Sequence, residues 1–511
     1  MPIRPELLDL LARRALTEDA ARPEAVARLH ARGGRTAREL IGALVDEGSF
    51  VEYGRYVTAA QEQRRSVDEL LDRSVADGIV GGLATIDGQQ VAVLSYDYLV
   101  MAGTQGFRGH TKTDRLFEVI ERLALPTVFF AAGGGGRPGD VDLPMVSGLH
   151  ATTFAEWARL SGTVPRIAVV DDNCFAGNAV IAGCSDLIVA SDRASLGMGG
   201  PAMIAGGGLG DFAASEVGPI DVMTTNGVVD VATSSEEVVP AARSLLGYFL
   251  GRAESWTAPE QDFLRDAVPE GERRAYDVLP IVETICDEDT VTVLRPDFAP
   301  ELLTALGRIE GRTVGVVAND TRHTAGAITA DAGDKAARFL QLCDAYGFPV
   351  VSLVDTPGMM VGPDAEKTAM VRHTSRLLIA GARLSVPLVG VVLRRGYGLG
   401  AQAMLGGSTR EPLMTLAWPG AHLGAMGLEG AVRLSMRKEL EAIEDDAERE
   451  AAVQELVAHA QSHASALNVA RHFEIDDVID PAETRFVLTR LLDAADRDGR
   501  LQGSRRPVDA W

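Results

Sequence analysis

The chain has 511 residues, of which 46% are apolar and 24% charged, and its formal net charge is −23. This length predicts two or more domains. The acidic balance argues against general nucleic-acid binding, while it leaves room for a locally basic pocket that holds an anionic ligand. No apolar run reaches the roughly 20 residues of a transmembrane helix, so no membrane association is expected.

The four cysteines are scattered without a CxxC pair, so neither a zinc ribbon nor a disulfide framework is expected, and we predict no metal site. Cys174 is interpreted as a packing residue. Charged residues interrupt the N-terminal segment and leave no signal-peptide core. We therefore expect a soluble, cytoplasmic protein.

The first half of the chain begins with helical periodicity and then changes to strand patterning. Asp87-Gly88 separates two apolar, strand-like runs, which is a strong β-hairpin signal. The run GGGGRPGD, residues 133–140, lacks the Lys-Ser/Thr pair of a phosphate-binding loop, and we expect a turn beside a ligand. The expected elements are, in order, helices over 5–48, the hairpin over 78–99, a helix over 112–123 and a strand over 127–131.

A strand, a Gly-rich turn and the start of a helix are expected within VPRIAVVDDNCFAGNAVIAGC, residues 164–184. The same order is expected within VPLVGVVLRRGYGLGAQAM, residues 386–404. Such a turn leaves several main-chain N–H groups unpaired and aimed at one point, which suits an oxyanion or a phosphate. The structural alternative is that the glycines only allow close packing of turn and helix.

These two stretches belong to an internal duplication. Pro165 lies 222 residues before Pro387 (387 − 165), and the offset is nearly constant upstream. An offset of 223 pairs Gly88 with Gly311, Asp97 with Asp320, Lys112 with Lys335 and Arg115 with Arg338. One spacing for both glycines and charges indicates two copies of a whole domain. We expect domains over 1–255 and 256–511, with 255–289 as the best linker candidate.

The second half is expected to repeat the elements of the first. Because Lys112 and Lys335 occupy equivalent positions, a shared structural role is favoured for them over catalysis. A polar tail from Arg497 is expected to fray. The expected elements are a hairpin at Glu310-Gly311, a helix over 335–345, a strand over 350–354, a turn over 355–358, a charged helical region over 432–468 and a last helix to about 496.

Several motifs resemble those of one known family. The most specific are GRTVGVVAND (311–320), KAARFLQLCDAYGFPVVSLVDTPG (335–358), RRGYGLGAQAM (394–404) and MGLEGAV (426–432). The duplicated unit resembles the crotonase-like fold, and the chain is similar to the β-type carboxyltransferase component of biotin-dependent acyl-CoA carboxylases. GMGGPAMIAGGGLG (197–210) and the RRPVDAW ending are most similar to the carboxyltransferase half of long-chain acyl-CoA carboxylases. The resemblance implies an α/β fold of two tandem crotonase-like (ββα superhelix) domains.

The resemblance further implies transfer of CO2 from carboxybiotin, tethered to a carrier protein, to the α-carbon of an acyl-CoA. Negative charge would develop on the thioester oxygen and on the ureido oxygen of biotin, so two oxyanion sites are needed. By motif position, the main-chain N–H groups of Gly177 and Asn178 would serve the acyl-CoA. Those of Leu399 and Gly400 would serve biotin.

Contacts to the cofactor groups also follow from the resemblance. The first domain, 1–255, would form the acyl-CoA side and the second, 256–511, the biotin side. Arg108 and His110 would lie near the adenine and phosphates of CoA, which enters as part of the substrate. The residues expected beside biotin are Tyr397, Gly398 and Ala401.

Three residues depart from the family pattern at the turns. Asn178 replaces a common glycine, and asparagine tolerates positive φ better than most residues. Since only main-chain groups act there, the Asn178 side chain is expected to be dispensable. Leu399 and Ala401 replace the more usual Gly and Tyr, and the small side chain of Ala401 indicates a roomier acyl pocket.

The resemblance also implies partners, because the sequence has no biotinylation motif and no ATP-grasp segment. We expect a biotin carboxylase, a biotin carboxyl carrier protein and a homo-oligomer, either a dimer or a trimer of dimers. The alternative function is the carboxyltransferase subunit of a biotin-dependent acyl-CoA decarboxylase or transcarboxylase. A dinucleotide-dependent oxidoreductase is disfavoured, since no strand ending in an acidic residue follows GYGLGA at the right distance. The duplication disfavours an acyl-CoA hydratase or isomerase.

Overall fold

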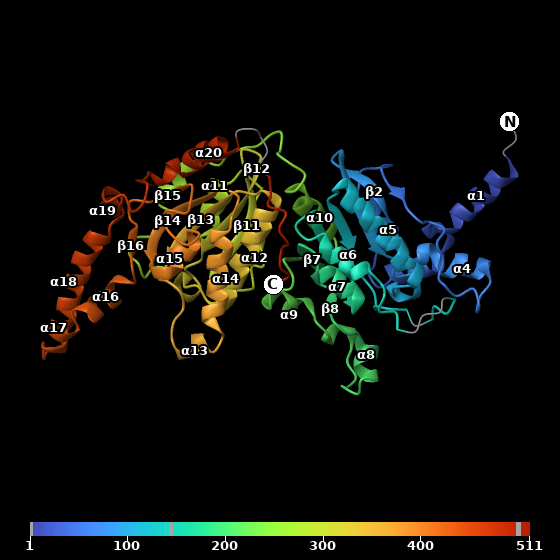
Figure 1. Cartoon of the computed structure of the whole chain (residues 1–511), viewed down its shortest axis with the longest axis horizontal. Helices are drawn as coiled ribbons and strands as arrows, with labels where there is room; N and C mark the ends of the chain where they lie inside the picture. Colours follow the sequence, from blue (N-terminus) through green and yellow to red (C-terminus); the bar gives the residue numbers. More distant parts are fainter. Residues whose placement is uncertain (1–3, 138, 143–146, 497–501) are drawn as a thin grey trace. The chain divides into compact units, whose positions relative to one another are not determined.

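The computed structural model describes residues 4–137, 139–142, 147–496 and 502–511 (Figure 1). The chain divides into two compact units, Met1–Leu250 with Ala510 and Gly251–Asp509 with Trp511, which we call unit 1 and unit 2. Each unit has its own large mixed sheet, as the duplication predicts. No helix among the described residues is long and apolar enough to span a bilayer.

Unit 1 is built on a seven-stranded sheet that opens with an antiparallel hairpin and continues with parallel strands. The predicted hairpin is confirmed, and its turn residues Asp87 and Gly88 have φ values of 50° and 76°, as a tight two-residue turn requires. A separate parallel pair is formed by β6 (Asn173–Phe175) and β8 (Ser195–Gly197). In spatial order the strands of the large sheet are β1 (Val51–Glu52), β2 (Ile79–Ile86), β3 (Gln89–Tyr96), β4 (Thr127–Phe130), β5 (Arg166–Val170), β7 (Leu187–Ser191) and β9 (Val231–Thr233).

The helix α5 (Phe107–Leu123) is the longest of unit 1 and begins five residues before its predicted start. The first turn of α5 was not predicted because it contains Gly109, which disfavours a helix. In the structure the N–H of Gly109 donates to the Asp77 carboxylate at 2.5 Å. Phe117 of α5 stacks on Trp157 of α6 (Thr153–Arg159), with ring centroids 4.8 Å apart. The other helices are α1 (Pro5–Leu16), α2 (Pro23–His30), α3 (Ala37–Leu44), α4 (Val67–Arg73), α7 (Gly177–Gly183), α8 (Pro201–Gly206), α9 (Ile220–Thr225) and α10 (Val238–Gly247).

Unit 2 repeats this strand order, with the predicted hairpin at Glu310-Gly311 confirmed by φ values of 50° and 74°. The β2–β3 hairpin of unit 1 therefore corresponds to the β11–β12 hairpin of unit 2. β16 (His422–Gly424) pairs with β14 outside the main order. In spatial order the strands are β10 (Thr292–Leu294), β11 (Leu302–Ile309), β12 (Arg312–Asn319), β13 (Val350–Thr356), β14 (Leu388–Tyr397), β15 (Met414–Ala417) and β17 (Asp477–Val478).

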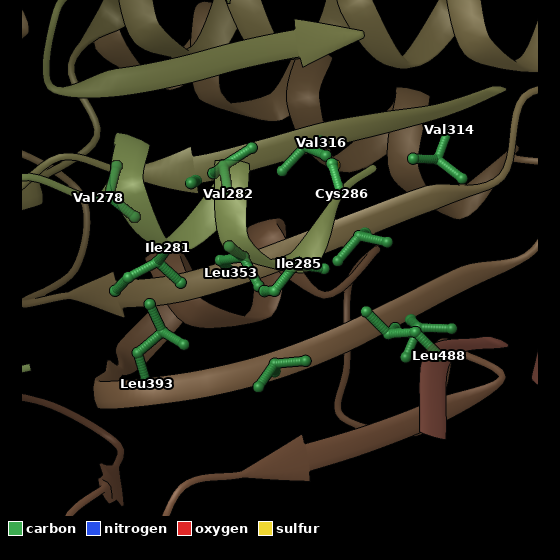
Figure 2. Packing of buried hydrophobic residues seen from close by; sticks show 14 of the residues in the cluster. Val278, Ile281, Val282, Ile285, Cys286, Val314, Val316, Leu353, Leu393 and Leu488 are labelled. Carbon is green, nitrogen blue, oxygen red and sulfur yellow. The ribbon is translucent and has the colours of Figure 1, made fainter. Parts of the chain in front are cut away.

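The proposed linker over 255–289 is wrong, because this segment supplies part of the core of unit 2. Its helix α11 (Leu279–Ile285) buries Val282 and Ile285 completely or almost so. These side chains pack with Val316 and Leu353 of the sheet (Figure 2). The prolines and charged residues on either side of α11 are typical of a linker and led to this prediction. The apolar face of α11, however, packs against the sheet and buries it.

The other helices of unit 2 include α12 (Ala330–Tyr346) and α14 (Met370–Ala382), which lie side by side (Figure 1). Arg497 lies outside the described residues, but residues 502–511 are not frayed. The N–H of Ser504 donates to the carbonyl of Asp344 on α12 at 2.7 Å. The remaining helices are α13 (Pro363–Glu366), α15 (Gly398–Met404), α16 (Leu428–Ser435), α17 (Arg437–Glu441), α18 (Asp446–Ala464), α19 (Ala466–Arg471) and α20 (Thr484–Ala495).

Candidate active site

Each Gly-rich turn follows a strand and opens a seven-residue helix, α7 in unit 1 and α15 in unit 2. In unit 1, Ala176 has φ 53° and ψ −125°, an unfavourable region for a residue with a side chain. Its counterpart Gly398 has φ 60°. Val180 donates the first hydrogen bond of α7, to the carbonyl of Ala176 at 3.0 Å. The N–H groups of Gly177 and Asn178 therefore precede the helical ladder.

The space around Gly177 is filled by side chains from other elements. A Cβ at Gly177 would overlap Oε1 of Gln105 and lie 2.8 Å from Cζ of Phe154. Gln105 is held by the hydroxyl of Tyr96 on β3, to which its Nε2 donates at 2.7 Å. Burial raises the pKa of Tyr96, so this hydroxyl stays protonated. A side chain at this position would therefore require both Gln105 and Phe154 to move.

The side chain of Asn178 makes three hydrogen bonds and is fully buried. Its Oδ1 accepts the N–H of Gly135 at 2.9 Å, and its Nδ2 donates to the carbonyls of Gly103 at 3.1 Å and Ala132 at 2.6 Å. The expectation that this side chain has no task therefore conflicts with its surroundings. A buried, fully bonded amide cannot be removed without leaving polar groups unpaired.

The second turn lines a cavity of about 430 Å³ in unit 2. Leu399 is 61% exposed at this cavity, whereas Ala401 is 6% exposed. Gly400 faces the turn at Gly358, and a Cβ at Gly400 would lie 2.6 Å from the Gly358 carbonyl carbon. Among the residues expected at biotin, Gly398 and Ala401 line the cavity, together with Leu399. A volume of this size is ordinary for a small-molecule site.

Tyr397, also expected at biotin, points its hydroxyl to Glu272, to which it donates at 2.9 Å. Burial first, and then the charge of Glu272, raises the pKa of Tyr397. Tyr397 does not line the cavity. Its hydrogen bond ties the end of β14 to the segment before α11, so it supports the turn from behind.

Two adjacent arginines at the end of β14 were not singled out from the sequence. Nε of Arg394 donates to Asp355 at 3.0 Å, and Nε of Arg395 donates to the other oxygen of Asp355 at 2.6 Å. All three side chains are buried. The pair RR inside an apolar strand was the available signal, since buried arginines require a carboxylate partner. The cluster at the end of β14 therefore has two positive charges, Arg394 and Arg395, and one negative charge, Asp355.

The two residues expected near CoA are engaged with protein groups. Nη1 of Arg108 lies 2.9 Å from Glu62, and the Arg108 side chain is 34% exposed. Nδ1 of His110 lies 2.8 Å from the hydroxyl of Thr153. Burial lowers the pKa of His110, which favours the neutral ring. Neither of them lines the cavity of unit 1 that is formed around Arg22 and Arg137.

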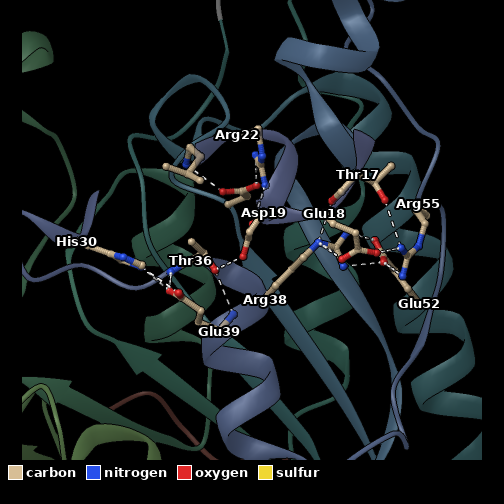
Figure 3. Close-up of polar contacts among 12 residues, drawn as sticks. Thr17, Glu18, Asp19, Arg22, His30, Thr36, Arg38, Glu39, Glu52 and Arg55 are labelled. Atoms are coloured by element: carbon tan, nitrogen blue, oxygen red, sulfur yellow. Dashed lines mark hydrogen bonds and ion pairs between the residues drawn. The ribbon is translucent and has the colours of Figure 1, made fainter. Parts of the chain in front are cut away.

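Unit 1 contains a cavity of about 890 Å³. Its strongly basic lining was not predicted from the sequence. We call it the basic pocket. Arg22 at its wall is fixed by Asp19 at 3.1 Å and Asp97 at 2.8 Å, within the ion-pair network of the N-terminal segment (Figure 3). The charged lining residues are Arg22, Arg28, Arg64, Arg65, Arg73 and Arg137, with Glu24 and Asp72. Six arginines against two carboxylates contrast with the net charge of −23 for the chain.

Lys112 and Lys335 bind main-chain carbonyls, which confirms their shared structural role. Nζ of Lys112 donates to Ile79 at 2.5 Å, and Nζ of Lys335 donates to Phe298 at 2.7 Å. Burial lowers the pKa of Lys112 to about 8 and that of Lys335 to about 7. Cys174 is completely buried, and burial raises the pKa of its thiol, which fits the packing role expected for it.

Comparison with known proteins adds family information to this geometry. Residues 28–506 match the model of the carboxyl transferase domain. The methylmalonyl-CoA carboxyltransferase 12S subunit of Propionibacterium freudenreichii subsp. shermanii is 32% identical, over 93% of this chain and 91% of that protein. A solved transcarboxylase 12S hexamer with bound methylmalonyl-coenzyme A has a TM-score of 0.85 and 29% identity, covering 100% of this chain and 98% of its own.

A further solved structure is a single-chain, multi-domain long-chain acyl-CoA carboxylase. It is 50% identical with a TM-score of 0.91 over 96% of this chain. The present chain spans about half of that protein's length, 49%.

Proposed function

Since this chain belongs to the carboxyl transferase domain family, we propose that it transfers CO2 from carboxybiotin on a carrier protein to the α-carbon of an acyl-CoA. The observation that carries this proposal is the pair of Gly-rich turns, one in each unit, each of which opens a helix. We assign the N–H groups of Gly177 and Asn178 to the thioester oxygen. Those of Leu399 and Gly400 are assigned to the ureido oxygen of biotin.

Main-chain donors suit this reaction because both substrates develop negative charge on an oxygen. Carboxybiotin, when bound, would supply the activated CO2, and the biotin nitrogen freed by its departure would take the α-proton of the acyl-CoA. The N–H groups of Gly177 and Asn178 are fixed before the α-proton leaves the acyl-CoA, so they stabilise the enolate charge without reorganisation. The cavity beside Leu399 and Ala401 supports biotin binding, since the glycine at 398 leaves the backbone open to a ring system.

The basic pocket suits the phosphates of CoA. Arg64 and Arg73 are exposed at its rim, and Arg65 is half-buried, so their guanidinium groups are able to receive an anion. Guanidinium groups bind phosphate through paired, charge-assisted hydrogen bonds. Arg108 and His110 are proposed to act at the CoA end through the segments that they hold, because their side chains are bonded to Glu62 and Thr153.

An apolar segment of unit 1 supports self-association. Met198, Met203 and Leu209 are 71%, 63% and 75% exposed, and no charged residue occurs between Arg193 and Asp211. In unit 2 the corresponding helix α16 is covered by α18. We propose that a second copy of the chain covers α8 in a dimer, which assembles further as a trimer of dimers.

A biotin carboxylase and a biotin carboxyl carrier protein are proposed as the other partners. Carboxylation is favoured over transcarboxylation by the 50% identity to the long-chain acyl-CoA carboxylase, against 32% to the transcarboxylase subunit. Transcarboxylation is the second candidate function. The two differ in the direction in which CO2 passes between the acyl-CoA and biotin at this chain.

The proposal is tested by the reverse reaction with purified protein. Malonyl-type CoA esters of increasing chain length are mixed with free biotin, and the acyl-CoA product is measured. We expect decarboxylation of the ester that depends on biotin. An absence of biotin-dependent product across the whole series would reject the proposed function. Leu209→Glu, examined by light scattering and by thermal unfolding, tests the assembly, and we expect smaller particles that have lost activity.

A further inference from the structure

The two units hold their Gly-rich turns in place with different side chains. In unit 2, Asn319 at the end of β12 holds two segments together, and we call this side chain the brace. Its Nδ2 donates to the carbonyl of Gly326 at 3.2 Å, and its Oδ1 accepts the N–H of Asp355 at 3.1 Å. The N–H of Gly358 is accepted by the hydroxyl of Thr356 at 3.1 Å. The hairpin strand and the turn after β13 are thus joined without any side chain from α15.

At the matching positions unit 1 has neither an amide in place of Asn319 nor a hydroxyl in place of Thr356. With the offset of 223, Asn319 corresponds to Tyr96 and Thr356 corresponds to Gly133. Tyr96 instead accepts a hydrogen bond from Gln105 and stacks on Phe129, with ring centroids 5.1 Å apart. The backbone groups that Asn319 and Thr356 serve in unit 2 therefore need another partner in unit 1.

Asn178 is that partner for two of the three groups. With the same offset, Gly326, Asp355 and Gly358 correspond to Gly103, Ala132 and Gly135, and those are the three residues that the Asn178 side chain binds. The Gly103 carbonyl and the Gly135 N–H match the groups bound in unit 2, whereas at Ala132 the side chain binds the carbonyl and not the N–H. In unit 2 the position of Asn178 is taken by Gly400, which has no space for a side chain because the Gly358 backbone is in contact with it. In unit 1 the Asn178 carboxamide lies between the two turns instead.

We propose that Asn178 is a positioning residue for carboxyl transfer, whose side chain fixes the first oxyanion turn against residues 133–136 and replaces the Asn319–Thr356 pair of unit 2. This inference rests on the proposed function. One residue then has two tasks: its main-chain N–H is a donor to the thioester oxygen, and its carboxamide aims that donor. Loss of the carboxamide leaves one N–H and two carbonyls unpaired in a buried site, which displaces the turn.

The first experiment compares two variants with the wild type in the reverse assay. Asn178→Gly installs the residue of unit 2 and is expected to lower kcat about 10- to 100-fold, because donors to developing charge act mainly in the transition state. The KM values for the CoA ester and for biotin should stay within about three-fold. Asn226→Gly, at an exposed helix end of unit 1, is the control and should match the wild type.

The second comparison transplants the brace of unit 2. Tyr96→Asn combined with Asn178→Gly places an amide where unit 2 has Asn319, and this double variant should be more active than Asn178→Gly alone. Tyr96→Asn by itself should be less active than the wild type, since Asn178 already occupies the partners. A double variant no more active than Asn178→Gly would overturn the equivalence of Asn178 and Asn319.

Asn178→Asp provides a pH readout that a purely structural defect would not give. The introduced carboxyl keeps an acceptor for Gly135, but it opposes two carbonyl oxygens unless it is protonated. Burial and these oxygens favour the protonated form, which restores one donor. The ratio of variant to wild-type kcat should therefore rise as the pH falls, and a constant ratio would overturn the proposal.

A readout without catalysis separates this inference from the proposed function. The Gly135 amide should exchange with solvent deuterium faster in Asn178→Gly than in the wild type, at matched thermal stability. Unchanged exchange together with wild-type kcat would overturn the brace. If the wild type itself lacks biotin-dependent activity, the proposed function fails, and the exchange result still decides whether Asn178 holds the turn.

Discussion

The backbone of Gly358 leaves no room for a side chain at Gly400: a Cβ at Gly400 would lie 2.6 Å from the Gly358 carbonyl carbon. Backbone cannot move aside as the end of a flexible side chain can, so the two turns of unit 2 require a glycine at their contact. Gly400→Ala should therefore displace the second turn and lower kcat/KM for biotin about 100-fold.

The control for this prediction is Gly420→Ala, because nothing lies within 4 Å of a Cβ at that position. Steady-state kinetics with free biotin as the varied substrate measure both variants. Equal activity of the two would contradict the assignment of Gly400 to the biotin site.

Within α7, two glycines offer a matched pair for the acyl-CoA side. A Cβ at Gly177 would overlap Gln105 and approach Phe154, whereas nothing lies within 4 Å of a Cβ at Gly183. Gly177→Ala should reduce turnover of the CoA ester about 10- to 100-fold, and Gly183→Ala should retain it. The biotin KM should not respond to either change. If Gly177→Ala were fully active, the assignment of Gly177 as a donor at the acyl-CoA side would be wrong.

Arginines of the basic pocket should affect substrates that carry the phosphates of CoA. Arg64→Ala combined with Arg65→Ala should raise the KM for a CoA ester about ten-fold, by loss of charge-assisted hydrogen bonds. The KM for the matching pantetheine ester, which lacks the adenosine phosphates, should not change. Arg115→Ala is the control, since Arg115 is exposed and paired with Glu118. Equal effects on both esters would place CoA elsewhere.

The family resemblance places Ala401 in the wall between biotin and the acyl group, so its small side chain should influence acyl chain length. We expect the wild type to prefer acyl groups longer than propionyl, because each buried CH2 contributes about 0.8 kcal/mol. Ala401→Tyr should lower kcat/KM for the longer esters and shift the preference toward acetyl- and propionyl-CoA. The measurement is kcat/KM across a chain-length series for both proteins. A wild-type optimum at acetyl-CoA would refute the roomier pocket and leave the carboxyltransferase assignment untouched.

Burial of Lys335 should make stability depend on pH in the alkaline range. Its pKa is lowered by burial to about 7 in the folded protein, from 10.5 for an ordinary lysine. Between pH 7 and 10 the unfolded chain therefore binds a proton that folded Lys335 has released, and the free energy of unfolding rises with pH. The slope from this residue should be at most about 1.4 kcal/mol per pH unit.

Lys335→Met removes this titration, so the difference in unfolding free energy between wild type and variant should grow from pH 7 to pH 10. Denaturant unfolding at several pH values measures it. Lys112, whose pKa is lowered to about 8, remains in both proteins and cancels in the difference. A difference that is independent of pH would mean that Lys335 stays charged when buried.

The sequence by itself determined the features that depend on local pattern and on repetition. Asp87-Gly88 marked the first hairpin, because Asp-Gly is a favoured pair for a two-residue turn with positive φ, and the offset of 223 placed Glu310-Gly311 at the same turn. The offset of 222 to 223 residues identified the duplication, since one spacing relates glycines, charges and prolines alike. The Gly-rich turns were also found in this way, because a strand that leads into a helix through glycines has few alternatives.

Tertiary structure alone decided which side chains meet. Asn178 differs from glycine in the sequence, but its three partners come from segments 43 to 75 residues away and no local preference reports them. The sequence likewise predicted only that Asp355 belongs to a turn, whereas in the fold its carboxylate pairs with Arg394 and Arg395. The basic pocket combines arginines from residues 22–73 with Arg137, and α11 became core only because the second sheet had an apolar face to cover. Burial and pairing are properties of the assembled chain, since the partner of a polar group is chosen by the fold and not by its neighbours in sequence.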